Sequence, residues 1–223
     1  GNPNCGKTTL LYLLAGLISP DAGKISGISG KIAFVFQENR LAENFTVYRN
    51  LKMVCKGQKI SKEMLGEMLE NVGMDKALLH APVSSLSGGM KRRVAILRAL
   101  LCDSAILFLD EPTTGLDLGG REQVMRTLSR IGEENSERAV VLVTHRLEEI
   151  PAGFDHIAIM GRKPIPAEDA TEAGVDSMGN PGAGTIVYTG SLENGLTDER
   201  LSELFGMPIE VQHTHGRWAA YAV

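Results

Sequence analysis

The stretch Gly1-Asn-Pro-Asn-Cys-Gly-Lys-Thr8 opens the chain and fits the pattern G-x-x-x-x-G-K-[ST]. Backbone N–H groups of such a loop can surround an anion, and the N-terminus of the following helix faces the same point. The spacing predicts a phosphate-binding loop, with Lys7 on the β- and γ-phosphates and the Thr8 hydroxyl on Mg²⁺. The alternative is a glycine-rich turn before a core helix. The predicted loop consists of Gly1, Asn2, Pro3, Asn4, Cys5, Gly6, Lys7, Thr8 and Thr9.

The cysteines are odd in number and far apart, at Cys5, Cys55 and Cys102. This pattern argues against a disulfide framework and favours a reducing cytosol. Two interpretations of Cys5 stay open. It is either a small filler within the loop or a reactive thiol at a helix N-terminus.

The composition favours an α/β core, because 43% of the 223 residues are hydrophobic and only 5% are aromatic. A net charge of −4 gives no indication of a nucleic-acid-binding face. No apolar run reaches the length of about 18 residues that spans a bilayer, and no signal peptide is visible. Because the chain begins inside a motif that normally follows a strand, we expect the N-terminal antiparallel strands of the domain to precede residue 1.

Short apolar runs alternate with segments of helical spacing, which predicts a mainly parallel sheet covered by helices. The predicted strands are residues 31–36, 105–109, 139–143, 156–160, 185–188 and 217–223. The predicted helices are residues 10–17, 46–55, 61–72, 87–101, 118–131 and 196–205.

Two acids, Asp110 and Glu111, directly follow the unbroken apolar strand predicted at residues 105–109. In open α/β sheets the carboxyl ends of the strands are where ligands bind. We therefore expect Asp110 to reach Mg²⁺ and Glu111 to orient and deprotonate the attacking water. The alternative is a strand that ends in a polar turn without chemistry.

Four further segments carry a resemblance to a known family. Leu86-Ser-Gly-Gly-Met90, followed by Lys91-Arg-Arg-Val-Ala-Ile-Leu-Arg-Ala99, resembles the signature of ABC ATPases, although the usual fifth residue is Gln. Phe36-Gln37-Glu38 is similar to the glutamine loop of that family, Thr114-Gly-Leu-Asp117 to its D-loop, and Val143-Thr-His145 to its switch histidine. Together with the phosphate loop, these motifs follow the family's order from Gly1 to His145.

The resemblance implies a P-loop NTPase fold with an inserted helical subdomain, and ATP and Mg²⁺ as cofactors. It implies a head-to-tail dimer in which Ser87, Gly88, Gly89 and Met90 serve the ATP of the partner. Gln37 is then expected to touch Mg²⁺ or the attacking water, and His145 to hold the γ-phosphate. Asp117 is the D-loop acid.

The expected organisation is one ABC ATPase domain over residues 1–223. Residues 1–38 and 101–160 form its catalytic core, and residues 39–100 form its helical signature subdomain. Residues 161–184, rich in Pro, Gly and Ala, are a loop or linker, and residues 185–223 are a strand and helix tail. Gln37 and Ser87 are 50 positions apart, which leaves room for a compact subdomain and none for a long coiled coil.

The resemblance implies the ATP-hydrolysing subunit of a transporter, with import favoured over export. The implied partners are a second ABC ATPase subunit in a homodimer, membrane permease subunits and a solute-binding protein, with no nucleic acid. The implied location is cytoplasmic, peripheral on the inner face of the cell membrane. Residues 41–51 carry several large apolar side chains just after Gln37, so we expect them to dock on the permease.

Two alternatives remain. One is a soluble ABC ATPase acting on nucleic acid or ribosomes, which predicts a basic surface and a second cassette. The other is an inactive, truncated nucleotide-binding module. The transported substrate stays open as well. Residues 35–55 and the Met90 signature resemble nitrate, sulfonate and taurine-type cassettes, whereas residues 201–223 resemble iron-complex or molybdate-type ATPases.

Overall fold

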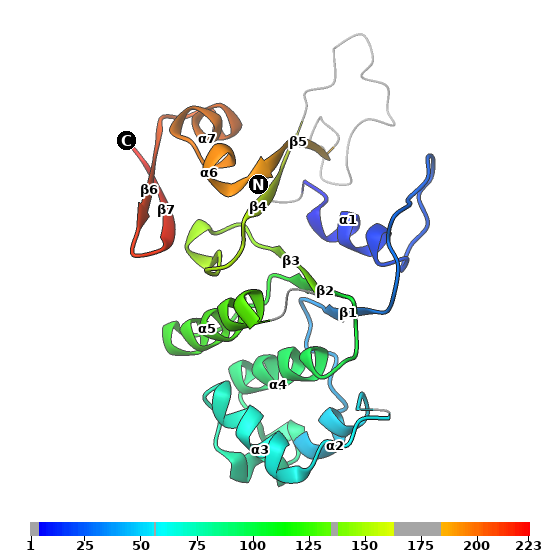
Figure 1. Ribbon diagram of the computed structural model, residues 1–223. Coiled ribbons are helices and arrows are strands. Elements are labelled where there is room, and N and C mark those ends of the chain that lie inside the picture. Colours follow the sequence, from blue (N-terminus) through cyan, green and yellow to red (C-terminus); the bar gives the residue numbers. More distant parts are fainter. Residues whose placement is uncertain (1–4, 56, 135–137, 163–183) are drawn as a thin grey trace. The chain divides into compact units, whose positions relative to one another are not determined.

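The computed structural model describes residues 5–55, 57–134, 138–162 and 184–223 (Figure 1). The chain folds into two compact units. The larger unit consists of Leu11–Thr144 and Pro151–Gly153, and the smaller unit of Gly1–Leu10, His145–Ile150 and Phe154–Val223. Within the described residues, no helix is long and apolar enough to span a membrane.

A three-stranded parallel sheet lies at the centre of the larger unit, in the order β1 (Ile32–Val35), β2 (Ile106–Asp110), β3 (Ala139–Val143). These strands confirm the predictions for the three apolar runs. Strand β2 is almost fully buried, whereas β3 alternates between exposed and half-buried positions and is less buried than its sequence predicted. In the described sheet β3 pairs on one side only, with β2, and this edge position accounts for the difference.

Side chains alternate between the two faces of this sheet. On one face, Val35, Leu107 and Leu109 form a core with Ile96 of α4 (Gly88–Leu100) and Leu128 of α5 (Leu118–Glu134). On the other face, aromatic rings pack around Tyr12, which belongs to helix α1 (Lys7–Leu14). The ring centroids of Tyr12 and Phe34 are 5.6 Å apart, and those of Phe34 and Phe108 are 5.9 Å apart. Helices thus cover the sheet on both faces, as the alternating pattern predicted.

The helical part of the larger unit contains α2 (Val47–Lys52), α3 (Lys62–Asn71), the short 3-10 helices Lys76–His80 and Val83–Ser85, and α4. Hydroxyl side chains fix where the three α-helices begin. Thr46, Ser61 and Ser87 each accept a hydrogen bond from a backbone N–H in the first turn. The apolar stripes of the helices meet in one core that includes Val47, Leu51, Leu65, Leu69, Val83, Val94 and Leu97. The predicted helices at residues 46–55 and 61–72 are confirmed with slightly shorter bounds.

In the smaller unit, β4 (His156–Arg162) pairs antiparallel with β5 (Gly184–Ser191). The sequence analysis identified both runs as strands and left their partners open. A parallel pair needs a crossover connection, usually a helix, and the sequence between the two strands is rich in Pro and Gly instead. The predicted linker, residues 161–184, lies outside the described residues except at its two ends.

The chain ends with α6 (Leu192–Gly195), α7 (Asp198–Phe205) and a hairpin of β6 (Ile209–Thr214) and β7 (Arg217–Ala222). Leu192, Leu196 and Leu201 are its buried core, with Phe154, Ile157 and Trp218 among the side chains packed against them. The predicted helix at residues 196–205 is confirmed as α7, which begins at Asp198 after its capping residue Thr197. Strand β6 was not predicted, although Ile209 and Val211 alternate with polar residues as in a half-buried strand.

Candidate nucleotide site

The predicted phosphate loop leads into helix α1, whose residues up to Leu10 belong to the smaller unit. Gly1, Asn2, Pro3 and Asn4 lie outside the described residues. Helix α1 begins at Lys7, so Lys7, Thr8 and Thr9 occupy its first turn. Gly6 has φ of 86° and turns the chain into the helix. This backbone conformation suits glycine. Lys7 and Thr8 therefore lie at a helix N-terminus, where backbone N–H groups favour an anion.

The Cys5 side chain packs inward and is 1% exposed. Its Sγ lies 3.8 Å from the carbonyl oxygen of Met160, and the Lys7 Nζ lies 3.7 Å from the same sulfur. A buried sulfur in contact with the backbone favours the interpretation of Cys5 as a filler. The backbone of Cys5 remains a candidate phosphate ligand.

The two predicted catalytic acids end strand β2 in the larger unit. Asp110 is the last residue of the strand and is 1% exposed. Glu111 has φ of 44°, a left-handed conformation that is unusual outside glycine. Its N–H donates to the Val143 carbonyl at 3.0 Å, and its Oε2 accepts a 3.2 Å hydrogen bond from the Thr114 hydroxyl. Strained backbone of this kind is frequent at functional sites.

Gln37 follows strand β1 and lies near the two acids in space, because one arginine binds both segments. The Arg92 guanidinium donates to the carbonyls of Phe36 and Gln37 and also to those of Asp110, Glu111 and Pro112. The structure thus brings Gln37, Asp110 and Glu111 together within the larger unit.

Arg92 was missed by the site prediction, which named only the residues of the motifs. A signal was present, however. Arg92 stands at the first position of an i, i+3, i+4, i+7 stripe whose other members, Ala95, Ile96 and Ala99, are small or apolar. All four are buried. A charged residue within a buried helical stripe needs polar partners, and so it indicates a nearby polar network.

The signature residues form the beginning of α4. The Ser87 hydroxyl caps the helix and accepts a 3.3 Å hydrogen bond from the Met90 N–H. Ser87 and Gly88 are exposed, whereas Gly89 and Met90 are half-buried. A Cβ on Gly89 would lie 3.3 Å from Leu116, so the following D-loop segment packs closely there.

Asp117 and His145 are both exposed. Asp117 caps α5, because its Oδ1 accepts a 2.7 Å hydrogen bond from the Gly120 N–H. His145 belongs to the smaller unit together with the phosphate loop, whereas Asp117 and the signature belong to the larger unit. Asp117 directly precedes α5, and His145 follows the end of β3 by two residues.

The possible Mg²⁺ ligands Thr8, Gln37 and Asp110 offer hydroxyl, amide and carboxylate oxygens. Hard oxygen ligands of this kind suit Mg²⁺. A buried carboxylate at the carboxyl end of a parallel strand is likewise suited to a phosphate-bound cation. These oxygen donors suit the cation by their chemistry, and the parallel sheet with a helix after the G-x-x-x-x-G-K-[ST] pattern is that of a P-loop nucleotide-binding protein.

Sequence comparisons narrow this class to a family. The family model described as ABC transporter matches residues 1–114. The chain is 35% identical over 164 residues to the aliphatic sulfonates import ATP-binding protein SsuB 1 of Pseudomonas savastanoi pv. phaseolicola (strain 1448A / Race 6), covering 74% of this chain and 68% of that protein. It is 34% identical over 187 residues to the molybdenum import ATP-binding protein ModC of Brucella abortus (strain 2308), covering 76% and 52%. The chain belongs to the ABC transporter family as an ATP-binding subunit, and its activity class is ATPase.

Solved structures of ABC ATPase domains are similar in fold. The archaeal ribosome recycling factor aABCE1 is similar with a TM-score of 0.75 and 27% identity, over 99% of this chain and 39% of that chain. The ATP-binding cassette MJ0796, a dimer bound to ADP and Pi, is similar with a TM-score of 0.56 and 29% identity, over 65% and 72%. The chain thus spans about half the length of the molybdenum relative and less of the recycling factor.

Proposed function

We propose that the protein hydrolyses ATP between two subunits of an ABC importer and so drives solute transport through a membrane permease. The observation that carries this proposal is the exposed beginning of α4. Ser87 and Gly88 are exposed, although the helix behind them is largely buried. A helix N-terminus with a hydroxyl and two glycines suits a phosphate. In the proposed dimer that phosphate belongs to the ATP held by the phosphate loop of the partner subunit.

In this proposal the phosphate loop holds the nucleotide, and Lys7 neutralises the β- and γ-phosphates. Glu111 takes the proton of the attacking water, and Gln37 and His145 orient the water and the γ-phosphate. Thr8, Gln37 and Asp110 would hold Mg²⁺, which would supply positive charge to the phosphate oxygens. The remaining signature residues, Gly89 and Met90, and the D-loop Asp117 complete the interface with the partner subunit.

The head-to-tail arrangement is supported by the dimeric state of the similar MJ0796 cassette, which has ADP and Pi bound. The importer assignment is supported by the sulfonate and molybdenum relatives, both of which are named import ATP-binding proteins. By analogy the partners are a second copy of this chain, permease subunits and a solute-binding protein, and the location is the cytoplasmic face of the cell membrane. The two relatives transport different solutes, so the proposal names none.

We also propose the division into a catalytic core of residues 1–38 and 101–160 and a helical signature subdomain of residues 39–100. The separate apolar core shared by α2, α3 and α4 supports the helical subdomain. The tail of residues 185–223 is supported by its own small core around Leu192, Leu196 and Leu201.

The proposed permease contact after Gln37 is smaller than the sequence suggested. Val47 and Leu51 are fully buried in the helical core, and Leu41 and Tyr48 pack against it. Most of the apolar side chains of residues 41–51 thus have an internal role. The exposed positions are Glu43, Asn44 and Arg49, so the contact that we propose for this segment is mainly polar.

One observation favours a second candidate function, an ABC ATPase acting on ribosomes. The similarity to the archaeal ribosome recycling factor extends over 99% of this chain. The net charge of −4 argues against it, since binding to RNA relies on basic surfaces. Purification of the protein with its native partners distinguishes the two, because transport predicts a membrane permease in the complex and the alternative predicts ribosomes.

Two substitutions test the proposed chemistry, because they are expected to fail differently. Lys7→Ala removes a charge from the triphosphate and should weaken ATP binding. Glu111→Gln should bind ATP with unchanged affinity, hydrolyse it very slowly and accumulate as an ATP-bound dimer. Equilibrium binding, phosphate release and gel filtration measure these effects. Normal turnover by Glu111→Gln would remove that residue from the mechanism.

A further inference from the structure

Arg92 is a buried cation that donates its hydrogen bonds to backbone carbonyls of the described residues. Its side chain is on α4, and the residue is 2% exposed. Nε donates to Pro112 O at 2.8 Å, and Nη2 donates to Asp110 O at 2.9 Å and to Glu111 O at 2.8 Å. Nη1 donates to Phe36 O and, at 3.2 Å, to Gln37 O. One planar fork thus joins two segments that are distant in sequence.

Burial of this charge is costly, and the carbonyl oxygens compensate for it. Burial lowers the pKa of Arg92 to about 10, against the opposing effect of the Asp110 and Glu111 carboxylates. The guanidinium therefore stays charged at neutral pH. A lysine ammonium is a compact point charge with three donors and lacks the planar fork, so it cannot reproduce these contacts on both sides.

The five carbonyls belong to the two segments that carry the proposed catalytic side chains. Of these two segments, the one with Glu111 has the more strained backbone, because Glu111 has the left-handed φ of 44°, which is unfavourable for a residue with a side chain. Its N–H is fixed by Val143 O and its C=O by Arg92. Removal of the guanidinium frees one end of this strained peptide and, at the same time, the peptide of Gln37.

We propose that Arg92 is a positioning residue that couples the glutamine loop to the catalytic carboxylates. It holds the backbone of Gln37 and the backbone of Glu111 in a fixed mutual position from one helix. A displacement of Gln37 is therefore transmitted to Glu111 through a single side chain. This inference rests on the proposed function, since it takes Glu111 as the base of ATP hydrolysis.

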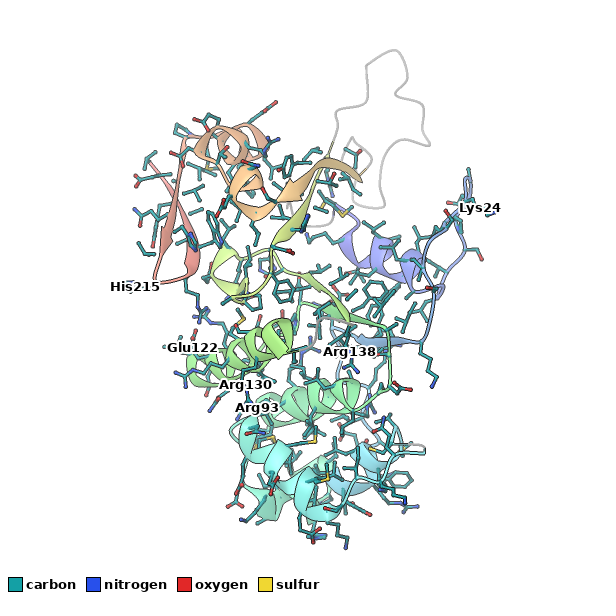
Figure 2. All side chains as sticks on the ribbon, viewed as in Figure 1. Lys24, Arg93, Glu122, Arg130, Arg138 and His215 are labelled. Atoms are coloured by element: carbon teal, nitrogen blue, oxygen red, sulfur yellow. The ribbon has the colours of Figure 1, made fainter. Side chains whose placement is uncertain are left out.

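The test compares Arg92→Lys with a matched control, Arg138→Lys. The Arg138 guanidinium also binds three carbonyls, those of Leu100, Cys102 and Ser104 beside the end of α4 (Figure 2). None of these carbonyls belongs to a proposed nucleotide segment. Each variant loses a planar guanidinium that binds several backbone carbonyls, and each keeps the positive charge. A purely structural role of Arg92 thus predicts similar behaviour of the two variants.

We expect Arg92→Lys to lower kcat about 10- to 100-fold, because a small displacement of catalytic groups has effects of that size. The ATP dissociation constant should change less than about threefold, since Arg92 donates its hydrogen bonds to the carbonyls of residues 36, 37 and 110–112. Arg138→Lys should keep the normal kcat even where its melting temperature falls. Arg92→Met serves as the second variant if Arg92→Lys does not fold. It too should lower kcat and leave the ATP dissociation constant nearly unchanged.

Equal kcat values for Arg92→Lys and the parent protein, with Glu111→Gln inactive, would overturn the positioning role and leave the proposed function intact. An equal loss of kcat in Arg92→Lys and Arg138→Lys would also overturn it. Normal turnover by Glu111→Gln would instead refute the proposed role of Glu111, and the coupling inference with it. Finally, Arg92→Lys combined with Glu111→Gln should be no slower than Glu111→Gln alone.

Discussion

Replacement of Asn50 by Ala is expected to destabilise the loop that follows the glutamine loop. Asn50 is fully buried on α2 and satisfies backbone groups of the segment before that helix. Its Oδ1 accepts from the Ala42 N–H at 2.9 Å, and its Nδ2 donates to Ala42 O at 3.0 Å and to Thr46 O at 3.1 Å. The amide side chain thus fixes where the chain turns from Gln37 into the helical core.

The magnitude follows from these three hydrogen bonds. At about 1 kcal/mol for each, Asn50→Ala should lower the free energy of unfolding by about 3 kcal/mol. For a chain of this size that loss corresponds to a fall in melting temperature of about 6–12 °C. The Thr46 carbonyl keeps its helical bond from the Asn50 N–H, so the loss is concentrated at Ala42.

Urea unfolding followed by circular dichroism measures the change, with Asn44→Ala as the control. Asn44 is exposed, and the same exchange there should stay within about 0.5 kcal/mol. The midpoint urea concentration of Asn50→Ala should fall with the slope unchanged. A midpoint for Asn50→Ala equal to that of Asn44→Ala would refute the reasoning.

Two further predictions concern the phosphate loop. A thiol reagent should modify Cys5 slowly in the native protein, since the Cys5 sulfur is buried. Rapid modification that ATP prevents, and that is absent in Cys5→Ser, would instead support the interpretation of Cys5 as a reactive thiol. Gly6→Ala should cost about 1–2 kcal/mol of backbone strain, because its φ is 86° and no atom of the described residues crowds the new Cβ. It should weaken ATP binding as well, whereas Gly16→Ala, with φ of 68° and equally open space, should lower only the melting temperature. Equal ATP affinity of Gly6→Ala and the parent protein would contradict this expectation.

The parallel sheet could be predicted because its strands are apolar runs of four or five residues, set between segments of helical spacing. The chemistry-bearing acids could be placed because Asp110 and Glu111 directly follow one of these runs. The pairing of β4 with β5 was not predicted, since an apolar run alone does not reveal its partner strand. Pairing depends on the connection between strands, and a Pro- and Gly-rich connection should have disfavoured a parallel crossover.

Contacts between distant segments account for the rest of what was missed. The left-handed backbone of Glu111 depends on Val143 and Arg92, which are 32 and 19 positions away. Similarly, the burial of Val47 and Leu51 depends on how α2 meets α3 and α4. The sequence indicated that residues 41–51 are apolar and left open whether they face a partner or a core.

The central claim is that each ATP lies between the phosphate loop of one subunit and the signature of the other. The most direct measurement mixes two inactive variants, Lys7→Ala and Ser87→Arg, under conditions of subunit exchange, and follows phosphate release. In the mixed dimer one composite site has an intact phosphate loop and an intact signature, whereas each variant alone has none. The proposed arrangement predicts that the mixture regains ATP hydrolysis above the sum of the separate variants. No recovery, with mixed dimers verified by differential tags, would contradict it.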